Sequence, residues 1–214
     1  MKKVLVTGGS RGIGEAIVEK FSSNGYEVWA PNRDELNLSR PFKLKQTDFD
    51  IIVNNAGINM LSEVGTSGYE LHTTMQVNFF APLTIVQQCL DHMLGNNFGR
   101  IVNIGSVWCE FAKPSRMVYS ASKNALHAFT KSVAVEYGIH NVLCNTVSPG
   151  FIKTDMTYKN NTDGELNAII DTIPVGRLGE PSEVADMVFF LCDNNNFING
   201  QNFIIDGGYS CSAH

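Results

Sequence analysis

The sequence lacks long runs of a single charge sign and long apolar runs. Its 16 lysines and arginines against 21 acidic residues give a formal net charge of -5, and no basic run exceeds two residues. Nucleic acids and anionic membranes attract basic clusters, so we expect neither as a partner. No segment reaches the roughly 18 apolar residues of a membrane span, and the apolar run after Lys3 is too short for a secretion signal. We therefore expect a soluble, cytoplasmic protein.

Cysteine is scarce, and its spacing fits no known framework. The five cysteines are scattered, odd in number and form no Cys-x-x-Cys pair. This pattern indicates neither a disulfide framework nor a zinc site, so we expect reduced thiols and no metal. The sequence also lacks repeats, low-complexity tracts and linkers. Its 214 residues are therefore expected to form one domain, residues 1–214, that includes both cofactor and substrate sites.

Short β-type segments alternate with longer helical ones along the chain. The strands are expected at 2–7, 26–30, 49–55, 99–106, 141–148 and 202–208, and the main helices at 12–24, 67–94, 117–138 and 181–193. Strands that are apolar on both faces and separated by helices predict a parallel sheet covered on both sides. We expect a single α/β domain with a Rossmann-type, doubly wound parallel sheet.

One region breaks this alternation. Only fifteen residues lie between Arg33 and Phe49. A parallel crossover normally takes a dozen residues or more and a helix. Two helices and a strand cannot fit there, so the fold is expected to be trimmed near its third strand.

Three glycines follow the first predicted strand directly and open the first predicted helix. Gly8 would allow a tight turn, Gly12 a close approach of the backbone to a pyrophosphate, and Gly14 close helix–strand contact. The N-terminus of the helix would then offer free N–H groups to phosphates. Plain turn chemistry is the alternative, but the strand before and the helix after favour a dinucleotide site.

The end of the second strand bears on the choice of coenzyme. An acid there would bind the ribose 2′-hydroxyl of NAD, whereas an arginine accommodates a 2′-phosphate. The acid position is occupied by Asn32, followed by Arg33, and Arg11 adds a second cation. This favours NADP(H). A shift of register would make Asp34 the ribose acid, so NAD(H) is the alternative.

Tyr119 and Lys123 are spaced to share one face of the helix predicted over 117–138. An ordinary tyrosine pKa is near 10, and a neighbouring ammonium stabilises the phenolate and lowers that pKa. The pair could therefore transfer protons, although such a spacing also occurs by chance.

Ser106 ends a predicted strand, where ligands of parallel sheets bind. Asn78 is an amide within an apolar helical stretch, suited either to fixing a kink or to holding a water.

Taken in order, these residues resemble a known family. The elements are Thr7-Gly8-x-x-x-Gly12-Ile13-Gly14, "NNAG" at 54–57, Asn78, Ser106, Tyr119-x-x-x-Lys123 and "SPG" at 148–150. Nearly the whole chain looks like a short-chain dehydrogenase/reductase. The stretch 175–208 resembles the 3-oxoacyl-acyl-carrier-protein reductases in particular.

The resemblance implies a role for each matched residue. Tyr119 would protonate the substrate carbonyl, and Lys123 would lower the pKa of Tyr119 and hold the nicotinamide ribose. Ser106 would orient the substrate oxygen, and Asn78 would anchor a relay water. The implied cofactor-binding residues are Gly8, Ser10, Arg11, Gly12, Ile13, Gly14, Asn32, Arg33, Asn37, Leu38, Asn55, Ala56, Gly57, Tyr119, Lys123, Pro149, Gly150, Ile152 and Thr154.

The chain departs from the family in two places. The stretch "NRDELNLS" resembles the compressed segment of dehydrorhamnose reductases, and by that analogy Asn37 replaces an aspartate near the adenine and Leu38 packs on it. The segment after Thr154 is also short, which implies little enclosure of the substrate. Lys153 and Lys159 there are candidates for a phosphopantetheine arm, with ordinary surface lysines as the favoured interpretation.

These observations predict an NADP(H)-dependent carbonyl reductase or alcohol dehydrogenase, most like the 3-oxoacyl-acyl-carrier-protein reductases. The enzymatic alternative is an NAD-dependent dehydrogenase of a small alcohol or sugar. A non-catalytic, cofactor-binding interaction protein on the same fold is a third interpretation. The resemblance also implies a homotetramer, with a dimer as the alternative, in which helices 67–94 and 117–138 form one interface and the C-terminal tail another.

Overall fold

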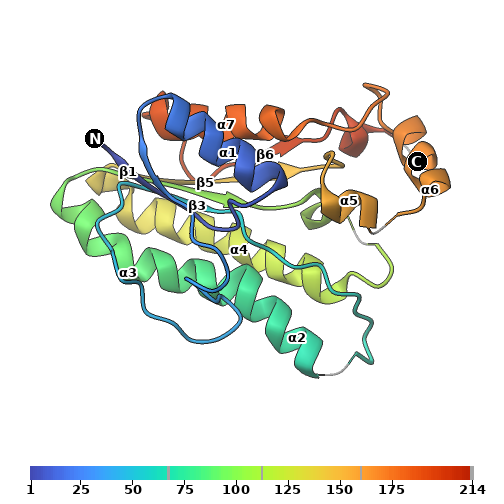
Figure 1. Ribbon diagram of the computed structural model, residues 1–214, viewed down its shortest axis with the longest axis horizontal. Coiled ribbons are helices and arrows are strands. Elements are labelled where there is room, and N and C mark those ends of the chain that lie inside the picture. Colours follow the sequence, from blue (N-terminus) through green and yellow to red (C-terminus); the bar gives the residue numbers. More distant parts are fainter. Residues whose placement is uncertain (67, 112, 160, 213–214) are drawn as a thin grey trace.

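Six parallel strands form the central sheet in the computed structural model, which describes residues 1–66, 68–111, 113–159 and 161–212 (Figure 1). The strands are β1 (Lys3–Val6), β2 (Glu27–Trp29), β3 (Ile51–Asn54), β4 (Gly99–Ile104), β5 (Val142–Pro149) and β6 (Asn202–Ile205). Their order is β2-β1-β3-β4-β5-β6, and every neighbouring pair is parallel. The predicted doubly wound sheet is confirmed.

Helices cover both faces of the sheet. The helices α1 (Gly12–Ser23) and α7 (Pro181–Asp193) pack on one face, and α3 (Ala81–Gly95) and α4 (Met117–Tyr137) lie on the other (Figure 1). In β1 the fully buried Val4 and Val6 belong to the core beneath α1 and α7, while Leu5 belongs to the core beneath α3 and α4. This alternation is the two-residue period of a strand buried on both sides.

The connection from β2 to β3 is a loop, as the short spacing predicted. Between the two strands the described chain forms turns and extended segments, with no helix. Leu36, Leu44 and Phe49 are buried against the sheet on the α3 side. Trp29 stacks on Phe49 with ring centroids 5.6 Å apart. These apolar side chains supply the cover that a crossover helix would otherwise provide.

The long helix expected over 67–94 consists of three parts. The helix α2 (Gly68–Met75) continues through a π-helical turn (Gln76–Phe80) into α3, and residue 67 lies outside the described residues. A π turn admits one extra residue, and such turns often lie at functional sites. Asn78 lies at its centre, so the amide in this apolar stretch coincides with a local break in the regular α-helix.

Two short helices follow β5, where the sequence suggested only a short cover. They are α5 (Asp155–Lys159) and α6 (Asp163–Thr172). Thr162 caps α6 in a reciprocal capping box with Glu165. Lys153 pairs with Glu180 at the surface.

Within the described part of the chain, no helix is long and apolar enough to cross a membrane.

Candidate active site

A cavity of about 360 Å³ opens at the carboxyl ends of four neighbouring strands. Its walls come from the segments that follow β1, β3, β4 and β5, and from the start of α4. The connections from β1 and β3 run to opposite sides, because β2 lies beyond β1 and β4 lies beyond β3. In open parallel sheets, ligands bind at such a switch point.

The glycine turn forms the floor of this cavity at the start of α1. Gly8 adopts a φ of 67°, which a side chain would strain. A Cβ on Gly14 would lie 2.0 Å from the Gly8 carbonyl oxygen, so no larger residue fits there. The N-cap residue Arg11 makes no side-chain cap. The first N–H groups of α1 are therefore available to an anion, as the glycine pattern predicted.

Polar side chains tie this turn to the end of β3. The side-chain amide of Asn55 donates to the carbonyl oxygens of Thr7 and Gly8, each 3.0 Å away. The Thr7 hydroxyl accepts hydrogen bonds from the backbone N–H groups of Asn55 and Ala56. These bonds fix the loop after β1 against the loop after β3. Thr7 is thus a positioning residue, a role that its place in the sequence did not reveal.

Tyr119 and Ser106 meet at the inner end of the cavity. Ser106 lies two residues after the end of β4, and its hydroxyl also accepts the Trp108 N–H, so it caps a local 3-10 turn as well. Both side chains are largely buried, at 8% and 6% exposure. Burial raises the pKa of Tyr119, and the hydrogen bond with Ser106 partly opposes that rise. Because its pKa is raised, the Tyr119 hydroxyl is protonated at neutral pH and can act as a proton donor.

Lys123 lies one helical turn beyond Tyr119, as its spacing predicted. Its Nζ is 5.8 Å from the centroid of the Tyr119 ring and donates to the carbonyl oxygen of Ile104, 2.6 Å away. Burial lowers the pKa of Lys123 to about 8. Its ammonium is thus held by the end of β4, the strand that also places Ser106.

Asn78 is fully buried in the π-helical turn. Its Oδ1 accepts the N–H of Ile58, and its Nδ2 donates to the Ile58 carbonyl oxygen and to the Ser122 hydroxyl. A Cβ built on Gly57 would lie 3.5 Å from Asn78 Oδ1 and 3.4 Å from Lys123 Nζ. The amide and the ammonium therefore flank one small space beside Gly57.

The structure brings most of the predicted site residues into this one cavity. Those lining it are Gly8, Ser10, Arg11, Gly12, Ile13, Gly14, Asn55, Ala56, Gly57, Ser106, Tyr119, Lys123, Pro149, Gly150, Ile152 and Thr154. The predicted residues outside the lining are Asn78, Asn32, Arg33, Asn37 and Leu38.

Asn32 and Arg33, expected at the 2′-position of the ribose, and Asn37 and Leu38, expected near the adenine, lie in the connection from β2 to β3 on the trimmed side of the sheet. The Asn32 side chain accepts hydrogen bonds from the N–H groups of Asp34 and Glu35, and the Glu35 carboxylate in turn accepts the Asn32 N–H. This reciprocal cap leaves Arg33 exposed at the tip of the turn. Asn37 Oδ1 accepts from Ser39.

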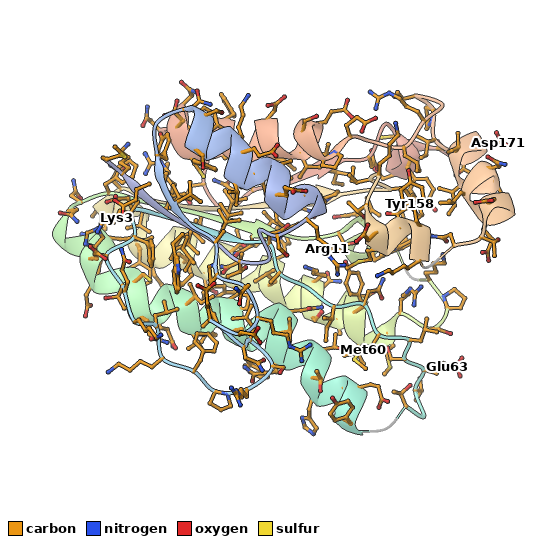
Figure 2. The ribbon with its side chains drawn as sticks, viewed as in Figure 1. Lys3, Arg11, Met60, Glu63, Tyr158 and Asp171 are labelled. Atoms are coloured by element: carbon orange, nitrogen blue, oxygen red, sulfur yellow. The ribbon has the colours of Figure 1, made fainter. Side chains whose placement is uncertain are left out.

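Leu38 is half-buried and packs against the core beneath α3 and α4. Arg11, the second cation predicted for the cofactor, does line the cavity. It lies between the start of α1 and α5 (Figure 2) and pairs with Asp155, with Nη1 and Oδ2 3.0 Å apart.

Several lining residues were not predicted from the sequence. They come from the loop after β3 and from the segment between β4 and α4, namely Asn59, Trp108, Lys113 and Arg116. Lys113 Nζ lies 5.5 Å from the centroid of the Trp108 ring. Arg116 is the N-cap residue of α4, three residues before Tyr119, and its backbone is not helical. No local sequence pattern indicated Arg116.

Comparison with known proteins gives a consistent assignment. A family profile described as enoyl-(acyl carrier protein) reductase matches residues 38–210. The 3-oxoacyl-[acyl-carrier-protein] reductase FabG of Chlamydia pneumoniae is 32% identical over 241 aligned positions, covering 97% of this chain and 96% of the relative. Carbonyl reductase family member 4 of Xenopus laevis is 31% identical, covering 97% of this chain and 98% of the relative.

Solved structures show the same fold over the full length. ElxO with NADP bound has a TM-score of 0.85 at 29% identity, covering 99% of both chains. The 4-hydroxyisoleucine dehydrogenase complexed with NADH has a TM-score of 0.88 at 28% identity, covering 100% of both chains.

Proposed function

This chain belongs to the short-chain dehydrogenase/reductase family of oxidoreductases, and we propose that it reduces a carbonyl compound to an alcohol with NADP(H). The observation that carries the proposal is the contact of the buried Tyr119 and Ser106 hydroxyls beside Lys123, in the cavity that the glycine turn also lines. The names of the relatives, an oxoacyl and a carbonyl reductase, support a carbonyl substrate.

The residues of the cavity fit a nicotinamide dinucleotide. The uncapped start of α1 and the glycine turn suit its pyrophosphate. Pro149 ends β5, and Gly150, Ile152 and Thr154 follow it; these four residues line the same cavity and would hold the nicotinamide end. When bound, the reduced nicotinamide supplies a hydride to the carbonyl carbon.

Tyr119 supplies the proton that completes the reduction. The carbonyl oxygen of a substrate would accept hydrogen bonds from the hydroxyls of Tyr119 and Ser106, which would stabilise negative charge on that oxygen. Tyr119 then transfers its proton to that oxygen, so the product is an alcohol and the enzyme holds a phenolate. The Lys123 ammonium stabilises this phenolate, which opposes the increase in the pKa of Tyr119 caused by burial. One proton from solvent restores the hydroxyl.

Asn78 is proposed to help that proton return. Its Oδ1 and the Lys123 ammonium flank the space beside Gly57, and a water there would accept from Lys123 and donate to Asn78. Because the Nδ2 protons are engaged by Ile58 and Ser122, the orientation of the amide is fixed. The role of Asn78 is thus to hold a relay water in place.

NADP(H) is proposed over NAD(H) because of the turn after β2. The carboxylate of Glu35 is engaged in the cap with Asn32, while Arg33 is exposed and is proposed to bind the 2′-phosphate. Structural neighbours contain NADP in one case and NADH in another.

A homotetramer is proposed as the assembly. Val135 and Ile139, near the end of α4, are 85% and 88% exposed, and an interface along this helix would cover them.

The decisive experiment is the variant Tyr119→Phe, assayed by NADPH consumption with a panel of ketones and 3-oxoacyl thioesters. We expect kcat to fall by about a thousandfold or more, since general acid catalysis contributes about 10² to 10⁴. NADPH affinity, measured by fluorescence titration, should stay unchanged. Tyr69→Phe removes a hydroxyl from a 70% exposed tyrosine and serves as the matched control. Undiminished turnover in Tyr119→Phe would exclude the acid role.

A further inference from the structure

Arg116 is a buried cation with an unused hydrogen-bond donor beside the proposed proton donor. Its residue exposure is 9%. Among the residues that the structure describes, its Nη1 has no hydrogen-bond partner although it is shielded from solvent. Arginine cannot shed its charge, so a buried guanidinium without a partner is unfavourable. An anionic group of a bound ligand would neutralise this charge and accept a hydrogen bond from Nη1.

The position of Arg116 indicates that this anionic group belongs to the substrate and not to the cofactor. Arg116 lines the cavity together with Tyr119, and it is the N-cap residue of α4, three residues before Tyr119. Its charge also lowers the pKa of Tyr119, as expected of a near neighbour. The glycine turn, the loop after β3 and the loop after β5 provide the proposed cofactor contacts, and none of them contains Arg116.

The segment around Arg116 is held by contacts from far along the chain. The Ser62 N–H donates to the Ser115 carbonyl oxygen, and the Ser62 hydroxyl accepts the Val118 N–H. The carboxylate of Glu63 accepts from the Ser115 hydroxyl. Glu63 is exposed and does not line the cavity.

Arg116 therefore faces a cavity with little negative charge of its own. Among the described residues, the only carboxylate in the lining is that of Asp155, which is already paired with Arg11. The anion that would balance the Arg116 charge is thus expected from outside the protein.

We infer that Arg116 binds a carboxylate of the substrate, so that the enzyme reduces a free oxo acid. This rests on the proposed carbonyl reduction and narrows its substrate class. A carboxylate matches the planar fork of the guanidinium with two parallel hydrogen bonds. In a carrier-bound thioester the carboxyl group is masked and neutral, and the phosphate of the carrier arm lies at the far end of an extended chain. Neither can neutralise the charge of a guanidinium buried in the cavity that Tyr119 lines.

The cavity can offer a second cation to the same group. Lys113 lines it on the same segment, beside the Trp108 ring. Lys113 is half-buried, so water screens its charge more than that of Arg116. We assign the specific contact to Arg116 and the attraction of anions toward the opening to Lys113.

The test compares each oxo acid with its own neutral ester. Straight-chain 2-, 3- and 4-oxo acids, their methyl esters and the N-acetylcysteamine thioester of 3-oxobutyrate are assayed with NADPH and the full chain. The wild type should prefer at least one acid over its ester in kcat/KM. Arg116→Met should lower kcat/KM for that acid by about 30-fold or more, since removing one partner of a buried charge pair is costly, and should change the ester by less than about threefold.

Two further variants examine the charge of Arg116 and its neighbour Glu63. Arg116→Lys keeps the charge without the fork, so it should fold and retain part of the preference for the acid. Glu63→Gln tests whether Glu63 is the true partner of Arg116, and it should leave the preference unchanged. Equal losses for acid and ester in the folded Arg116 variants, or a wild type that prefers the ester or the thioester, would overturn the inference.

A failure of the reductase proposal would be recognised separately. If the wild type reduces no ketone at all, the binding of each oxo acid to the protein with NADPH is measured by calorimetry. Binding of an acid that Arg116→Met abolishes would support the carboxylate site even then. Absence of acid binding to the wild type would overturn it.

Discussion

The ammonium of Lys123 donates a hydrogen bond to the backbone carbonyl oxygen of Ile104, and the two atoms are 2.6 Å apart. Ile104 is the last residue of β4, and Ser106 follows two residues later. The strand thus fixes both the cation and the serine hydroxyl against Tyr119. The consequence of this arrangement is a charged lysine that is only 3% exposed.

The burial of this charge predicts opposite effects of Lys123→Met on stability and on activity. Burial lowers the pKa of Lys123 from 10.5 to about 8. Between these values the unfolded chain binds more protons than the folded chain, so this group makes the fold more stable as the pH rises. At pH 7 the charge destabilises the fold. Lys123→Met should therefore raise the free energy of unfolding by about 1–3 kcal/mol at pH 7 and abolish turnover.

Urea unfolding at pH 7 and at about pH 10.5 checks this sign. The gain over the wild type should shrink at the higher pH, where the folded lysine is neutral. Lys131→Met, at an exposed position of the same helix, is the control and should change stability by no more than about 0.5 kcal/mol. A Lys123→Met protein less stable than the wild type at pH 7 would contradict the prediction.

Gly57→Ala tests the proposed relay water. The new methyl group would lie at ordinary contact distance, 3.4 Å from Lys123 Nζ and 3.5 Å from Asn78 Oδ1, so the fold should tolerate it. It would fill the space that a water needs. We expect kcat to fall by about 10- to 100-fold with NADPH affinity within about threefold, measured by steady-state kinetics and fluorescence titration.

The matched control is Gly65→Ala, where an added Cβ meets nothing within 4 Å. It should leave kcat unchanged. An unchanged kcat in Gly57→Ala would exclude a relay through this space. Loss of NADPH binding together with kcat would instead assign the effect to the cofactor.

Local sequence patterns were sufficient for the layered fold. The alternation of Val4, Leu5 and Val6 between two cores follows from the two-residue period of a strand. The spacing of Gly8 and Gly14 predicted a close helix–strand contact, and the structure has one. The helix α6 was missed, although Thr162 and Glu165 form the recognisable pattern of a capping box.

The site was less predictable where it depends on distant segments. Tyr119, Lys123 and Ser106 were found because each has a local signal of spacing or of strand end. The burial of Arg116 depends instead on its pairing with the loop at Ser62, far away in the sequence, and no local pattern indicates it. Packing of Leu38 on an adenine stays a prediction; in the structure Leu38 packs against the core beneath α3 and α4, where the crossover helix is missing.

The choice of coenzyme is the last prediction, and it depends on Arg33. Arg33 is exposed at the tip of a turn in which the side chains of Asn32 and Glu35 are engaged with the backbone. Arg33→Ala should raise KM for NADPH by about 10-fold or more, because a charge-assisted contact to the 2′-phosphate is lost, and leave KM for NADH nearly unchanged. Arg40→Ala, at an exposed arginine of the same connection, should change neither value. If the wild type used NADH as well as NADPH, or if Arg33→Ala affected both coenzymes equally, the 2′-phosphate contact would be excluded.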